Sequence, residues 1–272
     1  MAKIALLQMT SGVDPQANFD VIADAMEQAQ AGGAEVLFTP EMSLLLDRNR
    51  TRAAETLQSS DYSGFLPRLA KLATRGQTDL AIGSMPIALG DGKWVNRAHY
   101  FPADGRDPVT YDKIHMFDVE LSTGETWRES ATYEPGRAVQ TLAGTPLGML
   151  GFTICYDLRF PALFEALGTA RCDAISVPAA FTVPTGQAHW HVMLRARAIE
   201  ASAFVIAAAQ FGTHEDGRET YGHSLVVDPW GEVLLDMGGD GAGIAFCDID
   251  LDRIADVRQQ LPSLANKRKI PN

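Results

Sequence analysis

The chain has 272 residues, 46% of them apolar, which is enough to bury a large core in one or two domains. Its formal net charge of -11 argues against a nucleic-acid partner and gives no attraction to anionic membranes. The first residues lack the apolar length of a signal peptide, and no later apolar run spans a bilayer. These features predict a soluble cytoplasmic protein whose partners are small molecules or other proteins.

The three cysteines, Cys155, Cys172 and Cys247, are an odd number without paired spacing. This pattern argues against both a disulfide framework and a structural zinc site. Reduced thiols fit the predicted cytoplasmic location.

The N-terminal part of the chain alternates strand and helix. Residues 3–9 read as a strand, and the amphipathic helix after it is expected to stop at Gly32-Gly33. The next strand, residues 34–39, runs directly into Pro40-Glu41. A carboxylate at the C-terminal end of a central strand makes Glu41 a site candidate, although a solvated loop glutamate would look the same.

A more polar connection follows, and then a helix near residues 65–72 leads to a strand over residues 80–85. The apolar periodicity then changes from helical to strand-like. Residues 95–101 and 108–114 are two strand-like runs around a turn, which predicts a hairpin. Lys113 stands near the end of the second run. Such a lysine is more often a surface charge, so its candidacy depends on its neighbours.

The polar stretch over residues 118–135 is predicted to be an irregular loop of the length that tends to cover sites. Together with residues 47–62, it is expected to shape the substrate pocket. The loop carries four glutamates: Glu120, Glu125, Glu129 and Glu134.

Cys155 lies on a predicted strand-to-helix corner. Residues 147–154 are an apolar, β-prone run, and the residues from Pro161 onward have helical spacing. Main-chain N–H groups at the start of a following helix point toward negative charge, so this thiol could be a nucleophile. The alternative is a buried, inert cysteine, which is common.

The C-terminal half repeats the alternation, and no linker divides the chain, so one layered α/β domain is expected. Because each half runs strand, helix, strand, helix, strand and hairpin, we predict a pseudo-symmetric sandwich of two sheets. The last residues, 267–272, are expected to be disordered unless a partner holds them. The predicted elements are strands 173–177, 204–209 and 243–249, a hairpin of 221–228 with 232–235, a helix over 187–202 with Trp190, Met193, Leu194 and Ile199 inward, and a helix over 251–260.

Glu41, Lys113 and Cys155 each end an apolar strand, and the strand ends of a parallel sheet converge on one edge. The set is complete for attack on a carbon–nitrogen bond. A thiolate is the nucleophile, a carboxylate accepts its proton, and an ammonium stabilises the oxyanion on the carbonyl. Lys113 near the thiol is also expected to lower the pKa of Cys155.

Three motifs carry a resemblance to a known family: Pro40-Glu41, Tyr-Asp-Lys113-Ile-His-Met-Phe-Asp and Cys155-Tyr-Asp-Leu-Arg-Phe-Pro. In this order they resemble the signature motifs of the nitrilase superfamily of carbon–nitrogen hydrolases. The likeness implies a single carbon–nitrogen hydrolase domain over residues 1–262 and a C-terminal tail over residues 263–272. It also implies a four-layer α-β-β-α sandwich, dimers or larger homo-oligomers, and a Glu-Lys-Cys triad without metal or organic cofactor.

The same resemblance implies roles for the site residues. Cys155 attacks the amide carbon, Glu41 relays the proton to the leaving ammonia, and water cleaves the resulting thioester. Lys113 and the main-chain N–H of Tyr156 hold the oxyanion. Glu129 orients the lysine, a choice that rests on the family motif because four glutamates lie in its loop.

Within the superfamily, the chain is similar to the Nit branch, whose members act on small carboxylate-bearing amides. Segments such as Leu194-Arg-Ala-Arg-Ala-Ile-Glu200 look closer to the deaminated-glutathione amidase group than to ω-amidases, which act on α-ketoglutaramate. Arg159 is a candidate partner for a substrate carboxylate, with a structural arginine as the alternative. Phe181 and Thr182 follow another strand end and are candidates to line the acyl site, or to pack in the core.

Two other functions are considered. A metal hydrolase could use His189 and His191, but residues two apart on a helix point to different sides and make a poor chelating pair. A catalytically silent scaffold could keep the fold, and slow alkylation of Cys155 would favour it. The other histidines are read as structural or surface residues: His99, His115, His214 and His223.

Overall fold

The computed structural model describes residues 1–120, 124 and 126–269, and in them two six-stranded sheets face each other. The first sheet has the order β16 (Gly243–Ile249), β1 (Ala2–Gln8), β2 (Val36–Phe38), β3 (Asp79–Ala88), β4 (Trp94–Phe101) and β5 (Val109–Asp112). The second has the order β15 (Val233–Asp236), β14 (Leu225–Val227), β11 (Phe204–Ala207), β10 (Ala174–Ser176), β9 (Gly148–Phe152) and β8 (Thr141–Thr145).

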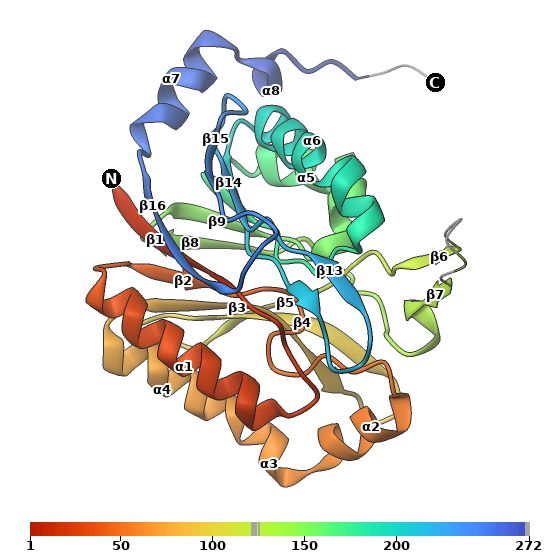
Figure 1. Ribbon diagram of the computed structural model, residues 1–272. Helices are drawn as coiled ribbons and strands as arrows, with labels where there is room; N and C mark the ends of the chain where they lie inside the picture. The colour runs from red at the N-terminus through yellow and green to blue at the C-terminus, as the bar shows by residue number, and fades with distance from the viewer. Residues whose placement is uncertain (121–123, 125, 270–272) are drawn as a thin grey trace.

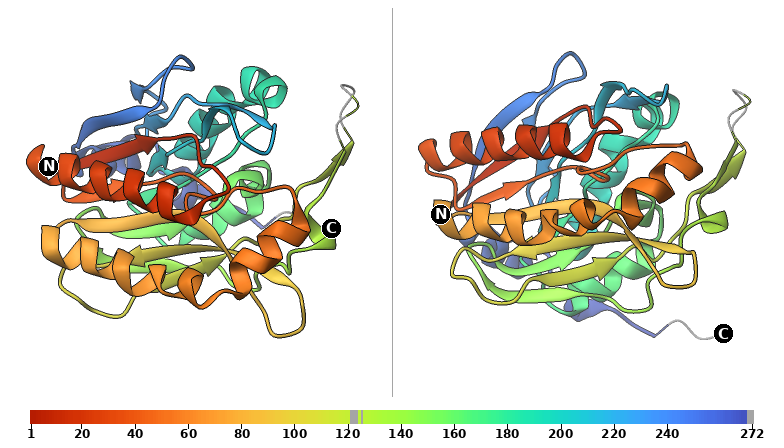
Figure 2. Two further views of the ribbon diagram at one scale, coloured as in Figure 1. Left: turned by 60° about the horizontal axis from the view of Figure 1, so that its bottom comes forward. Right: turned by 90° about the horizontal axis from the view of Figure 1, so that it is seen from below.

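Helices cover the outer face of each sheet (Figures 1 and 2). Helices α1 (Pro15–Ala31) and α4 (Phe65–Gly76) lie against the first sheet, and α5 (Pro161–Thr169) and α6 (Val183–Ala201) lie against the second. The four-layer α-β-β-α sandwich expected from the resemblance is therefore confirmed, and its two halves have the predicted similarity.

Strand β1 shows how the sequence builds these layers. Successive side chains of a strand point to opposite faces of its sheet. Ile4 and Leu6 belong to the core cluster between the two sheets, whereas Ala5 and Leu7 pack in the second cluster, beneath α1 and α4. A strand buried on both faces reads as a continuous apolar run rather than an alternating one, as this one does.

The polar segments hold more regular structure than predicted. The connection after Glu41 contains α2 (Arg50–Gln58) and α3 (Ser60–Ser63), and Asn49 caps α2 by accepting hydrogen bonds from two main-chain N–H groups. The predicted irregular loop over 118–135 contains a small antiparallel pair, β6 (Asp118–Glu120) with β7 (Thr126–Arg128). Residues 121–123 and Glu125 in that loop lie outside the described residues.

Helix α6 differs from its prediction in two ways. It begins at Val183 rather than near residue 187, because Pro184 suits the first turn of a helix. Ile199 is not inward, since its side chain is 42% exposed, and Met193 is only half-buried. Small residues, Ala198 and Ala201, take the inward positions of the last turns instead.

The chain continues past the second sheet into α7 (Asp252–Gln260) and α8 (Ser263–Asn266). The first residues of the predicted tail therefore form a short helix, and Lys267 after it makes an ion pair with Glu165 of α5. Residues 270–272 lie outside the described range, and the division into domain and tail stays a prediction. None of the helices in the described residues is long and apolar enough to cross a membrane.

Buried His99 on β4 predicts a pH-dependent stability. Burial and, second, the Arg97 charge lower the pKa of His99 to about 4, so the folded state holds a neutral ring where the unfolded chain takes up a proton. Since the unfolded state binds the extra proton between about pH 6.5 and 4, stability is lost as the pH falls through that window, by up to about 3 kcal/mol.

The variant His99→Phe keeps the stack on Phe101 and removes the proton site. We expect its free energy of unfolding, measured with denaturant, to fall less steeply than that of the wild type between pH 7 and about 4.5. Both proteins carry the same carboxylates, so their difference isolates the imidazole. Identical pH dependence in the two proteins would contradict the assignment.

Candidate active site

The structure brings the three predicted strand-end residues together. Lys113 Nζ lies 2.9 Å from Glu41 Oε1, and the Glu41 carboxylate is close enough to the Cys155 thiol to raise the pKa of that thiol. Glu41 and Lys113 follow β2 and β5, whose C-terminal ends lie at the same edge of the first sheet, and Cys155 follows β9 of the facing sheet. The nucleophile and its two partners therefore meet between the sheets, and each is less than a tenth exposed.

The backbone at Cys155 is a sharp corner. Its φ of 46° lies in the left-handed region, which costs a non-glycine residue about 1–3 kcal/mol. The Cys155 N–H donates to Pro178 O at 2.8 Å, and a 3-10 turn, η2 (Cys155–Arg159), leads from the thiol into α5. The predicted strand-to-helix corner is present, and its strain holds the side chain clear of the strand.

Asp157, a fully buried carboxylate that the sequence analysis did not single out, ties this corner to the lysine segment. It accepts hydrogen bonds from the main-chain N–H of Ile154 at 2.9 Å and the hydroxyl of Tyr111 at 2.7 Å. It also accepts one from the N–H of His115 at 3.0 Å. Because Lys113 lies between Tyr111 and His115, Asp157 sets the distance between the thiol and the ammonium.

Glu41 is held by donors on both carboxylate oxygens. Besides Lys113, Asn96 Nδ2 donates to Oε1 and the Ala180 N–H donates to Oε2, each at 2.9 Å. The main-chain carbonyl of Glu41 accepts from Gln210 Nε2 at 2.9 Å. The carboxylate is thus fixed in orientation before any substrate arrives, which a proton-relay group requires. Asn96 and Gln210 are further residues that the sequence analysis missed.

Among the described glutamates of its loop, Glu129 is the one that reaches the lysine. Its two oxygens lie 3.0 and 2.9 Å from Lys113 Nζ, and Oε2 accepts from the Phe117 N–H at 2.6 Å. Burial alone would lower the pKa of Lys113, but the negative charges of Glu129 and Glu41 outweigh it and raise that pKa well above its usual value. Lys113 is therefore a permanent cation within the cluster.

Lys113 lowers the pKa of the nucleophile as expected, but its effect does not decide the net direction. Burial, and then the charge of Glu41, raise the pKa of the Cys155 thiol well above its usual value, although Lys113 alone would lower it. The resting side chain is a neutral thiol. It needs a base at the moment of attack, and the Glu41 carboxylate is in place to serve.

The cluster lies in a cavity of about 240 Å³ that opens between the loops after β2, β5 and β9. All of the predicted pocket residues line it: Tyr156, Arg159, Phe181 and Thr182. Arg48, Trp127 and Tyr133 line it as well, so both segments expected to shape the pocket, residues 47–62 and 118–135, contribute to it, and Arg218 is a lining residue that was not predicted. The cavity therefore combines aromatic walls with positive charge.

Two of these arginines differ in their partners. Arg218 Nη2 lies 2.7 Å from the carboxylate of Asp216, so its charge is already paired. Arg159 lies over the rings of Tyr156 and Phe181, with Nη1 3.3 Å from His189 Nδ1. Among the described residues, no carboxylate forms an ion pair with Arg159. Its guanidinium is the one of the two that can still take a carboxylate ligand.

His189 and His191, considered above as a rival metal pair, point to different groups. His189 turns toward Arg159, whereas His191 Nε2 lies 2.9 Å from Asp236 Oδ2, so the two imidazoles have separate partners. Neither ring lines the cavity. The groups present at the cysteine are a thiol, a fixed carboxylate and a cation. Together they supply the nucleophile, the base and the oxyanion stabiliser that acyl transfer needs.

Comparisons with known proteins agree with this chemistry. A family model described as "Carbon-nitrogen hydrolase" matches residues 3–259. The chain is 38% identical over 270 residues to the deaminated glutathione amidase of Yersinia enterocolitica, covering 98% of this chain and 93% of that protein.

Two solved structures are also similar. The NitFhit protein of Caenorhabditis elegans superposes with a TM-score of 0.89 at 33% identity, covering 98% of this chain and 66% of that one. The present chain thus spans just under two thirds of that protein. Nit3 of Saccharomyces cerevisiae, a member of branch 10 of the nitrilase superfamily, superposes with a TM-score of 0.85 at 28% identity, covering 96% of this chain and 94% of that one.

Proposed function

Because the chain belongs to the carbon-nitrogen hydrolase family, we propose that it hydrolyses the amide bond of a small carboxylate-bearing substrate with Cys155 as its nucleophile. The observation that carries this proposal is the buried cluster at the cavity, in which the Glu41 carboxylate is hydrogen-bonded to the Lys113 ammonium and acts on the pKa of the Cys155 thiol. The family is one of enzymes acting on amides. The catalytic roles of these residues and the identity of the substrate are what we propose.

In the first half of the reaction, Glu41 takes the thiol proton as Cys155 Sγ attacks the amide carbon. The developing oxyanion is stabilised by the Lys113 ammonium and the main-chain N–H of Tyr156. Glu41 then gives its proton to the leaving nitrogen, the carbon–nitrogen bond breaks, and a thioester remains. Glu129 keeps the ammonium in place through hydrogen bonds to both of its carboxylate oxygens.

In the second half, water enters the space left by the amine. Glu41 takes a proton from this water, the hydroxide adds to the thioester carbon, and the same donors hold the second oxyanion. The carbon–sulfur bond breaks, the acid leaves, and the thiol regains the proton from Glu41. One carboxylate thus serves as base and acid in both halves, which suits its fixed position.

For the substrate, we propose deaminated glutathione, as in the name of the Yersinia relative, with α-ketoglutaramate as the alternative. Both offer an acyl group with a carboxylate that Arg159 could bind. Ammonia leaves only from a primary amide such as α-ketoglutaramate, whereas the substituted amide of deaminated glutathione releases an amine. The deciding assay measures the acid product from both compounds and from simple aliphatic amides, side by side. If the protein hydrolyses none of these compounds, the proposed function is wrong.

The carboxylate contact predicts a selective effect of Arg159→Met. Losing a charge-assisted hydrogen bond costs about 1.5–3 kcal/mol, so KM for a carboxylate-bearing amide is expected to rise at least about tenfold. The same variant should leave hydrolysis of an uncharged aliphatic amide nearly unchanged. Arg106→Met is the matched control, because Arg106 pairs with Asp104 on the surface hairpin. Equal losses on charged and uncharged amides would assign Arg159 a structural role.

A silent scaffold remains the alternative of another class. The raised pKa of Cys155 means that slow alkylation no longer separates the two functions, because a neutral thiol reacts slowly in an active enzyme too. Turnover on the amide panel separates them.

We also propose a homo-oligomeric, cytoplasmic protein. The location is supported by the absence of a disulfide among the three cysteines, which all lie in the described residues. The assembly is supported by exposed apolar side chains on α6 and on the β14–β15 hairpin, which a second copy would cover. They are Val192, Ile199, Trp230, Val233 and Leu234. A sedimentation mass of one chain would contradict the assembly.

A further inference from the structure

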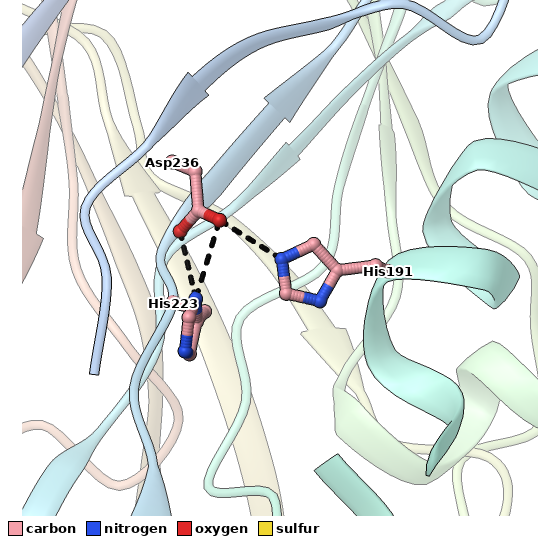
Figure 3. A group of neighbouring side chains, drawn as sticks. All are labelled: His191, His223 and Asp236. Carbon is pink, nitrogen blue, oxygen red and sulfur yellow. Dashed lines mark hydrogen bonds and ion pairs between the residues drawn. The ribbon is translucent and has the colours of Figure 1, made fainter. Parts of the chain in front are cut away.

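We propose that His191, His223 and Asp236 form a binding site for a divalent first-row metal cation, with Zn²⁺ as the best-fitting ion. Figure 3 shows the carboxylate of Asp236 between the two imidazoles. His191 Nε2 lies 2.9 Å from Asp236 Oδ2, and His223 Nδ1 lies 2.9 and 3.2 Å from its two oxygens. All of the ligand atoms lie within 4.8 Å of one another.

These separations match the size of a zinc site. Zinc binds imidazole nitrogen and carboxylate oxygen at about 2.0–2.2 Å, which places tetrahedral ligand atoms about 3.4 Å apart. The two His–Asp contacts of 2.9 Å would have to open by about 0.5 Å to reach that value. Both rings would bind as neutral imidazoles, with their proton on the outward nitrogen. Two imidazoles and a carboxylate, without thiolate, suit Zn²⁺ better than Ca²⁺ or Mg²⁺.

The backbone holds His223 in place for this arrangement. His223 follows β13 (Glu219–Tyr221), and its φ of 54° is left-handed. Its N–H donates to Gly238 O at 2.9 Å, and its carbonyl accepts from the indole N–H of Trp190 at 2.8 Å. Trp190 is fully buried and directly precedes His191 in α6. One ligand residue is therefore anchored by the neighbour of the other, which preorganises the pair.

The surroundings leave space for the rings and for a cation. Tyr221 stacks on the His223 ring with centroids 4.4 Å apart. A Cβ on Gly239 would come within 3.1 Å of His223 Nε2, so glycine there preserves room for the imidazole. In the single chain the three side chains are 23–35% exposed, so a cation can reach them and keep water at its remaining positions. The acidic chain as a whole favours cation binding.

The cation would be a structural ion that cross-links three segments, and it would take no part in the reaction. None of the three ligands lines the cavity of Cys155. The ion would join α6 to the segment after β13 and to β15. The N–H of Tyr221, at the end of β13, donates to the carbonyl of Phe181 at 3.0 Å, and Phe181 lines the cavity. Bound metal should therefore raise the melting temperature and steady one wall of the cavity.

The test uses the full chain carrying Cys155→Ala, which removes the active-site thiol as a competing ligand. After chelator treatment and dialysis, Zn²⁺ is titrated by calorimetry, and Co²⁺ is added as a spectroscopic probe. We expect one Zn²⁺ per chain with Kd of about 10 µM or below, and a Co²⁺ spectrum without a sulfur charge-transfer band. The melting temperature should rise with Zn²⁺.

Two ligand variants and one control decide the outcome. His191→Gln and His223→Asn keep polar groups, and asparagine tolerates the left-handed backbone, so both should fold. Each should weaken Zn²⁺ binding at least about tenfold. His189→Gln, two residues away on α6, should bind like the parent. Unchanged binding in either ligand variant, equal loss in the control, or no binding by the parent up to about 1 mM would overturn the site and leave a hydrogen-bonded cluster.

Discussion

Replacement of Cys155 by alanine is expected to lower kcat/KM for amide hydrolysis by at least about 10⁴-fold. No other thiol can take its place, because Cys172 is buried in the core and Cys247 lies on β16, and neither lines the cavity. Alanine carries the same left-handed backbone strain at this corner as cysteine does, so the variant is expected to keep the fold. Turnover of the amide panel and a melting curve measure the two properties separately.

The matched control for this variant is Cys247→Ala, which removes a partly exposed thiol on the edge strand of the first sheet. It is expected to keep full activity. Intact-mass measurement during turnover should detect an acyl adduct in the control and none in the Cys155→Ala protein. Full turnover by Cys155→Ala would remove the proposed nucleophile.

Replacement of Glu41 by glutamine is expected to lower kcat by about 10²–10⁴-fold, with a much smaller change in KM. The neutral thiol has lost its base. The glutamine side chain can neither take a proton from water nor give one to the leaving nitrogen. Steady-state kinetics on the best substrate of the panel measure both constants. A loss in KM alone would indicate that Glu41 binds substrate rather than moving protons.

A structural change accompanies this chemical one. Glutamine has one acceptor oxygen in place of two, whereas Asn96, Ala180 and Lys113 all donate to the carboxylate. At least one donor is left unpaired, which costs about 1–3 kcal/mol of stability. Glu134→Gln is the control, because Glu134 pairs at the surface with Lys93 and lies outside the cavity lining. Its activity should equal that of the wild type.

Local pattern explains which parts of the fold could be predicted. The strands before Glu41, Lys113 and Cys155 are apolar runs with clear ends, so each end could be read from a few adjacent residues. The helices α2 and α3 and the β6–β7 pair were missed because their short polar segments lack an apolar period. Ile199 was misplaced because small alanines carry the inward positions beside it.

The rest of the site depends on residues brought together from distant segments. Asn96, Asp157 and Gln210 act through contacts across 42 to 169 residues of sequence, and no local pattern marks such partners. The pKa of Cys155 illustrates the consequence. The sequence indicated that Lys113 is a neighbour of Cys155. The direction in which the pKa of Cys155 shifts, however, depends on burial and on Glu41, and both are set by packing.

By itself, the sequence determined the order of the main strands and helices, the two-sheet architecture and the identity of the three groups at the strand ends, because apolar periodicity and turn residues act over short distances. Only the tertiary structure decided the protonation of Cys155 and Lys113, the pairing of Arg218 but not of Arg159 with a carboxylate, and the meeting of His191 with His223 and Asp236. Electrostatics and ligand geometry depend on distance in space, and residues far apart in the chain acquire that distance only when the layers pack.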